Sequence, residues 1–325
     1  MSKTILVTGG AGYIGSQTNL SLLEAGYKII IFDNLAYGHK EVIPDDSIFV
    51  EGDLNNVGDI KKVFREHQID GVIHFAAYAY VGESVTDPAK YYQNNIGGTL
   101  NLLVAMIEAK VLNIVFSSTC ATYGIPTSSP ITENNKQEPI NPYGYTKLVV
   151  ENMLKDFQTA YKLNSIALRY FNACGADSKL RTGESHDPET HLIPLILDVA
   201  SGKRESIAIF GTDYNTPDGT CVRDYIHTQD LASAHILALE KLMNNEIRCD
   251  QINLGTGTGF SVLEIINSAK AVTGKDIKIV LGARRTGDPD ILVADNSKAR
   301  KVLGWKPSNS SLENIITSAW QWHLK

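Results

Sequence analysis

The 325-residue sequence lacks the features that mark several broad classes of protein. It contains no apolar run of about 18 residues, so we expect no membrane-spanning helix. The apolar stretch before the first glycines is too short for a secretory signal peptide. Lys and Arg form no block and the formal net charge is −6, which argues against a protein that binds nucleic acid through its phosphates. Repeats and low-complexity tracts are also missing, and these absences leave an ordinary globular protein.

Cysteine is scarce and shows no pattern. The four cysteines are Cys120, Cys174, Cys221 and Cys249. No CxxC pair and no Cys/His spacing typical of a metal site connects them, so the sequence predicts no metal centre. Isolated cysteines behave as small buried hydrophobic residues, and a chain with free thiols fits a reducing, cytoplasmic location.

Short apolar runs alternate with longer mixed segments through the first half of the chain. The runs are rich in Ile, Val and Phe and are typical of strands covered on both faces. They span residues 4–9, 28–34, 47–53, 71–77, 113–119 and 165–172. Helical spacing of apolar residues recurs between them, at 20–26, 59–68 and 98–110. This alternation predicts an α/β protein with a parallel, doubly wound sheet.

After residue 173 the alternation of apolar runs and helical segments becomes less regular. Residues 173–191 are polar and contain glycine, which predicts a loop, and mixed helices and short strands follow. We expect residues 1–173 to form a dinucleotide-binding domain and residues 174–325 a smaller mixed α/β lobe, some segments of which return to the first domain. The cleft between two such lobes is the default place for a ligand.

The stretch VTGGAGYIGS, at residues 7–16, holds glycines at a characteristic spacing. Gly10, Gly12 and Gly15 match the GxGxxG fingerprint of dinucleotide-binding proteins, and Gly9 adds a glycine three residues before Gly12. Glycine there permits a tight turn, a close approach to a pyrophosphate and close packing of helix on sheet. A glycine-rich turn that merely joins a strand to a helix would look the same, so the motif alone is weak.

The end of the next apolar run sharpens this interpretation. Asp33 lies about 20 residues after the glycines, the usual distance for a carboxylate that binds the adenosine ribose. A carboxylate accepts a hydrogen bond from the 2′-hydroxyl and repels a 2′-phosphate, so the sequence favours NAD over NADP. The alternative is that Asp33, beside Asn34, only ends a strand.

The stretch NPYGYTK carries the chemistry that we expect. Asn141 can cap a helix that begins at Pro142, which would place Tyr143 and Lys147 four residues apart on one face. A cationic lysine and an oxidised nicotinamide would both favour the phenolate of Tyr143, which could then act as a base. Tyr145 is the competing tyrosine, but it lies only two residues from Lys147. A Tyr-x-x-x-Lys pair also arises often by chance on surface helices.

Three hydroxyl side chains lie at the end of the apolar run at 113–119. Ser117, Ser118 and Thr119 would lie at the carboxyl end of the sheet, where ligands bind in doubly wound folds. Each is a candidate to hydrogen-bond the reacting oxygen, and each could equally serve only the local turn.

Together these motifs resemble those of the extended short-chain dehydrogenase/reductase family. The matching pieces are TGGAGYIG, FDN, FSST, YGYTK, RYFN and VRDYIH, and the similarity runs along nearly the whole chain. The more specific pieces YVGESV, IFGTDYNTPDGTCVRDYIHTQDLA and RRTGDP are similar to those of members that invert carbon 4 of UDP-glucose and UDP-galactose. The resemblance implies a Rossmann-type sheet with a smaller substrate-binding lobe, a resident NAD, a UDP-sugar substrate and a homodimer.

The resemblance also assigns roles to residues along the cofactor. It places Gly9, Gly12, Tyr13, Ile14 and Gly15 at the pyrophosphate, Asp33 and Asn34 at the adenosine ribose, Asp53 and Leu54 at the adenine, Phe75, Ala76 and Ala77 along the channel, and Asn94 and Phe171 beside the nicotinamide. Tyr143 would be the base, Lys147 its electrostatic partner and Thr119 the hydroxyl that binds the sugar, with Tyr143 and Lys147 also touching the cofactor.

A second set of residues is assigned to the UDP-sugar. The set comprises Asn172 for the nucleotide sugar, His191, Leu192 and the run from Ala208 to Phe210 for the uracil region, Arg223 and Arg285 for the diphosphate, Asp288 for the ribose, and Leu292 for the sugar pocket. Two arginines suit a diphosphate because a guanidinium fork fits phosphate oxygens.

Three positions depart from the family pattern. Thr119 stands where many members have serine, which keeps the hydroxyl. Ala79 stands where some carry lysine, so one cofactor contact is absent. Leu292 stands where a tyrosine closes the sugar pocket in members restricted to glucose and galactose. We therefore expect room for an N-acetyl group, and activity on UDP-N-acetylglucosamine and UDP-N-acetylgalactosamine.

Other activities of the same family compete with this expectation. A 4,6-dehydratase is disfavoured because Cys120 and Ala121, rather than an Asp-Glu pair, follow Thr119. A UDP-glucuronate decarboxylase and a UDP-pentose 4-epimerase remain alternatives. A non-catalytic NAD-sensing module would keep the glycine turn but has no use for Tyr143 and Lys147.

Overall fold

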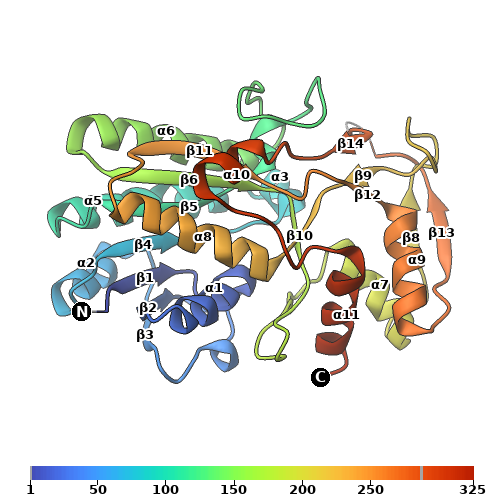
Figure 1. The fold of residues 1–325 in the computed structure, drawn as a ribbon, viewed down its shortest axis with the longest axis horizontal. Helices are drawn as coiled ribbons and strands as arrows, with labels where there is room; N and C mark the ends of the chain where they lie inside the picture. Colours follow the sequence, from blue (N-terminus) through green and yellow to red (C-terminus); the bar gives the residue numbers. More distant parts are fainter. Residues whose placement is uncertain (1, 286–287) are drawn as a thin grey trace.

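Seven parallel strands form the large sheet of this computed structural model, which describes residues 2–285 and 288–325 (Figure 1). The strand order is β11-β6-β5-β4-β1-β2-β3. Their bounds are β1 (Thr4–Thr8), β2 (Lys28–Asp33), β3 (Ile48–Glu51), β4 (Gly71–His74), β5 (Asn113–Thr119), β6 (Asn164–Tyr170) and β11 (Cys249–Leu254). The order runs outward from β1 in both directions, so β1 and β4 flank the switch point where such sheets bind ligands.

Alternate residues of each central strand enter different cores. In β1, Ile5 and Val7 belong to one hydrophobic cluster and Leu6 belongs to another. The same division recurs in β2, β4 and β5. Side chains of successive strand residues point to opposite faces, so these strands need apolar residues at every position. That need explains the continuous Ile/Val/Phe runs of the sequence.

Helices cover both faces of the sheet. One face packs against α1 (Tyr13–Glu24), α8 (Thr228–Met243) and α10 (Ser297–Leu303), and the other against α2 (Val57–Glu66), α5 (Thr99–Glu108) and α6 (Pro142–Tyr161). Three of these elements, β11, α8 and α10, come from beyond residue 173 and return to the large sheet.

A third core forms the smaller lobe, at the right of Figure 1. Its elements are α7 (Leu192–Ser201), α9 (Val262–Thr273), α11 (Leu312–His323) and the parallel pair β8 (Ile207–Phe210) and β13 (Ile279–Gly282). Two small sheets connect the lobes: β7 (Asn172–Cys174) with β10 (Tyr225–His227), and β9 (Val222–Arg223) between β12 (Phe260–Ser261) and β14 (Ile291–Leu292). The remaining short pieces are η1 (Lys40–Val42), α3 (Val81–Thr86), α4 (Pro88–Tyr91), η2 (Tyr92–Gly98) and η3 (Cys120–Tyr123).

The structure confirms the fold class that the sequence predicts. Each of the six apolar runs overlaps one strand of the large sheet, and only β6 begins outside its run, one residue earlier at Asn164. Helix α6 begins at Pro142, and the Asn141 side chain accepts a hydrogen bond from the Gly144 amide at 2.8 Å, as expected of a cap. Within the described residues, no helix is both long and apolar enough to cross a bilayer.

Candidate active site

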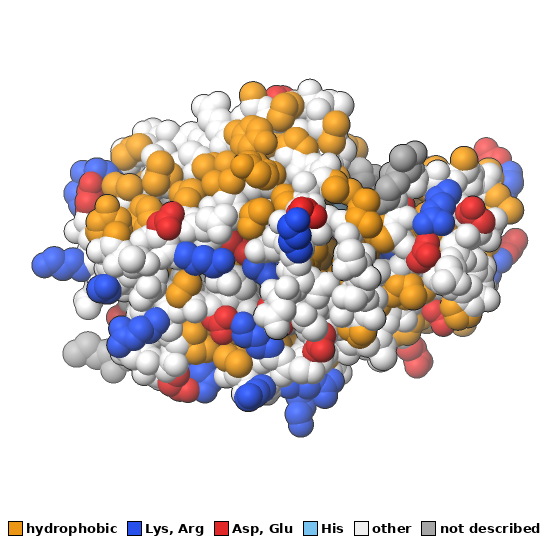
Figure 2. Space-filling view, turned by 90° about the horizontal axis from the view of Figure 1, so that it is seen from above, with side chains coloured by type: hydrophobic (Ala, Val, Ile, Leu, Met, Phe, Trp, Pro, Cys, Tyr) orange, Lys and Arg blue, Asp and Glu red, His pale blue; other side chains and the backbone are white. Residues whose placement is uncertain are grey.

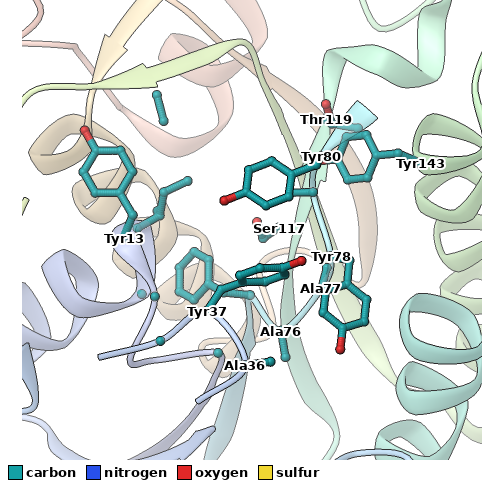
Figure 3. Close-up of a pocket in the computed structure, with 18 of the residues that line it drawn as sticks. Tyr13, Ala36, Tyr37, Ala76, Ala77, Tyr78, Tyr80, Ser117, Thr119 and Tyr143 are labelled. Carbon is teal, nitrogen blue, oxygen red and sulfur yellow. The ribbon is translucent and has the colours of Figure 1, made fainter. Parts of the chain in front are cut away.

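A cavity of about 400 Å³ opens at the carboxyl ends of β1, β2, β4 and β5 (Figure 3). Its lining comes from both halves of the chain, from the glycine turn after β1 to the loop that precedes α7. Every residue that the sequence analysis assigned to the cofactor lines this one cavity. The cavity thus lies where doubly wound sheets bind nucleotides.

The glycine turn brings bare backbone to the cavity wall. Gly9 has φ +72°, and a Cβ on it would lie 2.5 Å from the Ala76 amide nitrogen. A Cβ on Gly15 would lie 2.3 Å from the Gly9 carbonyl oxygen. Helix α1 starts directly after this turn, at Tyr13, and its capping residue Gly12 has no side chain to occupy the first amides. These amides and the helix dipole suit a pyrophosphate.

Asp33 is held at the end of β2 by backbone amides. Its two carboxylate oxygens accept hydrogen bonds from Ala11 at 2.9 Å and from Leu35 at 2.8 Å. Burial raises the pKa of the carboxyl, and these two amides oppose the rise. The position is the one at which a carboxylate can bind a ribose hydroxyl.

Lys147 is buried beneath the cavity, with 4% of its surface exposed. Its Nζ donates a hydrogen bond to the Ser117 carbonyl at 2.8 Å. The same Nζ lies 5.8 Å from the centre of the Tyr143 ring and 4.8 Å from that of Phe116. Burial lowers the pKa of Lys147 to about 7, against a smaller opposing effect of Glu151.

Tyr143 projects beside Thr119 at one end of the cavity (Figure 3). Burial raises the pKa of its phenol, and the nearby Tyr170 phenol raises it further, while a hydrogen bond with Thr119 lowers it. The expected lowering of this pKa by Lys147 and an oxidised nicotinamide remains a prediction for the cofactor-bound protein. Tyr145 is 49% exposed and does not line the cavity.

Strand alternation separates the three candidate hydroxyls at the end of β5. Ser118 faces away from the cavity and donates a hydrogen bond to Glu151 at 2.6 Å. Ser117 and Thr119 line the cavity. The Ser117 hydroxyl is already bound to the Tyr170 hydroxyl at 2.5 Å. The Thr119 oxygen accepts a bond from the Ala121 amide at 3.1 Å, which leaves its own proton to donate.

The residues assigned to the UDP-sugar fall into two places. Asn172 and His191 line the cavity, whereas the others lie outside its lining: Leu192, Ala208, Phe210, Arg223, Arg285, Asp288 and Leu292. Leu192 is the first residue of α7 and Ala208 lies within β8.

Most of the outlying residues gather beside one another around β8, β9 and β14. Arg223 forms an ion pair with Asp288 at 2.5 Å, so in this structure its guanidinium already has an anionic partner. The Arg285 guanidinium stacks 4.2 Å above the Phe210 ring. Leu292 pairs with Arg223 across the strands.

Leu292 connects this group to the cavity. It packs against a small hydrophobic cluster that includes Phe171, and Cys120 packs against the same cluster. Phe171 and Cys120 also line the cavity beside Thr119. Leu292 thus contacts both Arg223, across the strands, and the hydrophobic cluster that borders the Thr119 end of the cavity.

Part of the cavity wall consists of residues that were not predicted from the sequence. Tyr37 meets Tyr78 and Tyr80 edge to face, with ring centres 5.4 and 5.2 Å apart, and all three line the cavity (Figure 3). Glu184 and His186, from the loop before α7, line it as well. The tyrosines on both sides of Ala79 were a visible signal, since aromatic residues commonly wall ligand pockets. The loop residues gave no signal because a polar loop has no periodicity.

Comparison with known proteins places this chain in a family. The sequence model of the NAD dependent epimerase/dehydratase family matches residues 5–255. UDP-glucose 4-epimerase from Halalkalibacterium halodurans is 52% identical, over 98% of this chain and 95% of its own. Among solved structures, UDP-glucose 4-epimerase from Brucella ovis in complex with NAD has a TM-score of 0.96 and 48% identity, with 99% of both chains covered. The UDP-Glc/GlcNAc 4-epimerase from Campylobacter jejuni has a TM-score of 0.89 and 42% identity, also over 99% of both. The chain belongs to the NAD dependent epimerase/dehydratase family.

Proposed function

We propose that this protein is an NAD-dependent 4-epimerase that interconverts UDP-glucose and UDP-galactose. The observation that carries the proposal is the meeting of Tyr143, Thr119 and Lys147 with the glycine turn and Asp33 in one cavity. Relatives that are 48–52% identical over 98% of this chain are named UDP-glucose 4-epimerase. The glycine turn and Asp33 fit NAD, because they combine bare amides for the pyrophosphate with a carboxylate that would repel a 2′-phosphate.

In this mechanism Tyr143 is the base that accepts the reacting proton. Its phenolate takes the proton of the sugar 4-hydroxyl and later returns it, while Thr119 donates a hydrogen bond to the same oxygen. NAD held by the glycine turn and Asp33 would supply an acceptor for the hydride of the carbon 4 C–H bond and would return it within the same turnover. Lys147, once protonated, favours the phenolate through its charge.

Inversion requires that the 4-keto sugar present its other face before the hydride returns. Binding energy must therefore come from the UDP and not from the sugar ring. Arg223 and Arg285 are the residues that we assign to the diphosphate. Asp288 would release Arg223, or share it, when the substrate arrives.

The test is the Tyr143→Phe variant, with Tyr145→Phe as the matched control on the same helix. We expect Tyr143→Phe to lower kcat by about a hundredfold to ten-thousandfold, because general base catalysis contributes on that scale. NAD bound to the purified protein should stay unchanged. Near-normal turnover by Tyr143→Phe would refute the assignment, as would an equal loss in Tyr145→Phe.

Two alternative activities of this family can be distinguished in the same assay. A UDP-glucuronate decarboxylase would release carbon dioxide from UDP-glucuronate, and a UDP-pentose 4-epimerase would turn over UDP-xylose. We expect the highest kcat/KM with UDP-glucose and UDP-galactose. Separation of the epimers from a panel of the four sugars decides among them.

We further propose that N-acetylated UDP-hexoses are accepted. Leu292 lies beside the Thr119 end of the cavity, through its contact with the cluster of Phe171. Leucine is smaller than tyrosine and lacks its hydroxyl, so this wall leaves more room around carbon 2 of the sugar. Support comes from the Campylobacter jejuni relative, which is named for both glucose and N-acetylglucosamine substrates.

We propose that two copies associate through the face built by η2, α5 and α6. Large apolar side chains are exposed there: Tyr92 at 40%, Leu100 at 43%, Val104 at 39% and Tyr145 at 49%. Figure 2, which looks down on the side of α6, shows hydrophobic side chains gathered across this surface. Contiguous exposed apolar surface of this kind is typical of a protein interface.

The cytoplasm is the location that we propose. The four cysteines are free thiols, and Cys174 is buried at the junction of the two lobes in β7. Unpaired cysteines persist in a reducing compartment. Detection of the native protein in the cytosolic fraction would test this.

A further inference from the structure

Four potential metal ligands converge in the loop between β7 and α7. Within the described part of the chain, the ligand atoms of Glu184, His186, Glu189 and His191 all lie within 4.8 Å of one another. All four come from eight consecutive residues of the polar loop. Of the four, His191 alone has another proposed role, at the uracil region of the substrate.

The distances among these atoms suit a single small cation. His191 Nδ1 lies 2.8 Å from Glu184 Oε1 and 2.9 Å from Glu189 Oε1. His186 Nδ1 lies 3.3 Å from Glu184 Oε1 and 3.8 Å from Glu189 Oε2. Ligands at about 2.1 Å from a tetrahedral metal are about 3.4 Å apart. The observed spacings lie on both sides of that value, and both imidazoles turn the same nitrogen inward.

Two buried atoms of this group lack a hydrogen bond of good geometry among the described residues, Glu184 Oε1 and His186 Nδ1, which lie 3.3 Å apart. The Glu184 side chain is only 9% exposed, and its Oε1 lies 2.8 Å from His191 Nδ1, which can serve as its ionic partner only when that imidazole carries a proton. Because a buried carboxylate oxygen needs a partner, a cation at the centre of the cluster would take the place of that proton and bind the oxygen together with both imidazole nitrogens.

We propose that Glu184, His186, Glu189 and His191 form a binding site for Zn²⁺. Two imidazole nitrogens and two carboxylate oxygens are a donor set that zinc accepts in tetrahedral geometry. Mg²⁺ and Ca²⁺ prefer oxygen ligands alone, so the two histidines disfavour them. Two carboxylates also balance the charge of one divalent ion.

The surroundings hold these ligands in place. The rings of Tyr13 and Tyr80 each meet His186 edge-on, with centres 6.0 Å apart. The Glu184 carbonyl accepts a hydrogen bond from the Trp322 indole at 2.9 Å. The Ser185 carbonyl is bound by the His39 ring at 2.8 Å. Supporting contacts of this kind orient the ligands of metal sites.

Bound zinc would fix the loop over the cofactor cavity. Glu184, His186 and His191 line that cavity, and the loop is joined to helix α1 by the bond from the Tyr13 hydroxyl to the Gly175 carbonyl at 2.5 Å. A metal that binds the folded loop stabilises it by the free energy of binding. The amides of residues 175–191 should then exchange with solvent more slowly when the metal is present.

Equilibrium dialysis against micromolar Zn²⁺, followed by elemental analysis, tests the site on the full chain without a histidine tag. We expect one bound zinc per chain in the wild type, and its loss in His186→Ala and in Glu184→Gln. His323→Ala is the matched control, because His323 forms a histidine–carboxylate pair with Asp198 outside the cluster. Replacement with Co²⁺ should give the intense visible bands of a four-coordinate site in the wild type and the control only.

Hydrogen exchange with and without Zn²⁺ gives the second readout. We expect slower exchange of residues 175–191 in the wild type and no change in Glu184→Gln, a variant of the same shape. Circular dichroism shows whether each variant is folded. Equal zinc content in all four proteins, or none in the wild type, would overturn the proposal and leave a network of charged histidines and glutamates. This result does not depend on whether the protein epimerises UDP-sugars.

Discussion

At the scale of single residues, burial of Lys147 disfavours the charged form of its amine. Its pKa is lowered to about 7 from its usual 10.5, so between these values the unfolded chain binds more protons than the folded one. The free energy of unfolding must therefore rise as the pH increases from about 7 to 10.5. The lysine destabilises the fold most at and below pH 7, and this cost disappears as pH approaches 10.5.

Lys147→Met should reveal this cost directly. Relative to the wild type, the variant is expected to gain several degrees in Tm at pH 7 and to lose that gain progressively up to pH 10.5. Lys155→Met, which removes an exposed lysine from the same helix, is the control. Differential scanning calorimetry at a series of pH values provides the measurement, and a difference in Tm that does not change with pH would contradict the interpretation.

Leu292 determines the width of the sugar pocket in our proposal. Leu292→Tyr should lower kcat/KM for UDP-N-acetylglucosamine by at least about tenfold, since the larger ring must overlap the N-acetyl group at a cost above about 1.4 kcal/mol. The value for UDP-galactose should change by less than about threefold. Leu292→Met, which keeps the volume, should retain both activities. A wild type that does not turn over the N-acetylated sugar would sink the proposal.

At the scale of elements, one buried ion pair joins α6 to β5 and β6. Arg169 forms two hydrogen bonds to the Glu151 carboxylate, at 2.9 and 2.5 Å, and the exposed fractions of the two side chains are 2% and 0%. Ser118 and Gln137 donate hydrogen bonds to Glu151 at 2.6 and 3.0 Å, and Arg169 donates one to the Tyr123 hydroxyl at 2.8 Å. Helix α6 carries Tyr143, so this pair anchors the helix that bears the proposed base.

Removal of one partner of the Glu151–Arg169 pair should destabilise the fold. Glu151→Ala leaves the buried Arg169 charge without its partner and should destabilise the fold by about 3–5 kcal/mol. Replacing both residues by apolar ones, Glu151→Leu with Arg169→Met, should recover much of the loss. Urea unfolding followed by circular dichroism measures both effects. The exposed pair of Glu205 and Lys278 is the comparison, and an equal effect of Glu205→Ala would contradict our account.

The elements differ in how far the sequence could predict them. The strands of the first half were predictable because burial on both faces demands continuous apolar runs, and α6 because Asn141 and Pro142 mark its start. Strand β11 was not, since CDQINL at the sheet edge has few apolar residues and its first three are only partly buried. Its place beside β6 depends on contacts far along the chain.

The residues of the candidate site also differ in how far the sequence could predict them. The spacing of the glycines, Asp33, Tyr143 and Lys147 predicted residues that line one cavity. Strand alternation could also have separated Ser118 from Thr119. The raised pKa of Tyr143 could not be predicted, because it depends on burial. The convergence of Glu184, His186, Glu189 and His191 could not be predicted, because it depends on how an irregular loop folds.

At the scale of the whole molecule, the exposed apolar face predicts a dimer. The double variant Leu100→Glu with Val104→Glu places two charges on the outer side of α5 and should shift the protein to a monomer. Leu281→Glu is the control, because Leu281 is 67% exposed on β13 in the smaller lobe. Light scattering after size-exclusion chromatography gives the mass. A wild-type monomer, or a double variant that stays dimeric, would contradict the proposed interface.

The return of β11 and α8 to the large sheet has a consequence for how the protein is made. A ribosome that has released only residues 1–173 has delivered six strands, but on the face that α8 occupies it has delivered only α1 to cover them. Apolar side chains such as Val115 and Ile166 pack in the same cluster as Leu231 and Leu239 of α8, and they lack these partners until residue 243 has emerged. The nascent chain thus presents a partly uncovered hydrophobic sheet during much of synthesis. Chaperones that bind such surfaces would act in that interval.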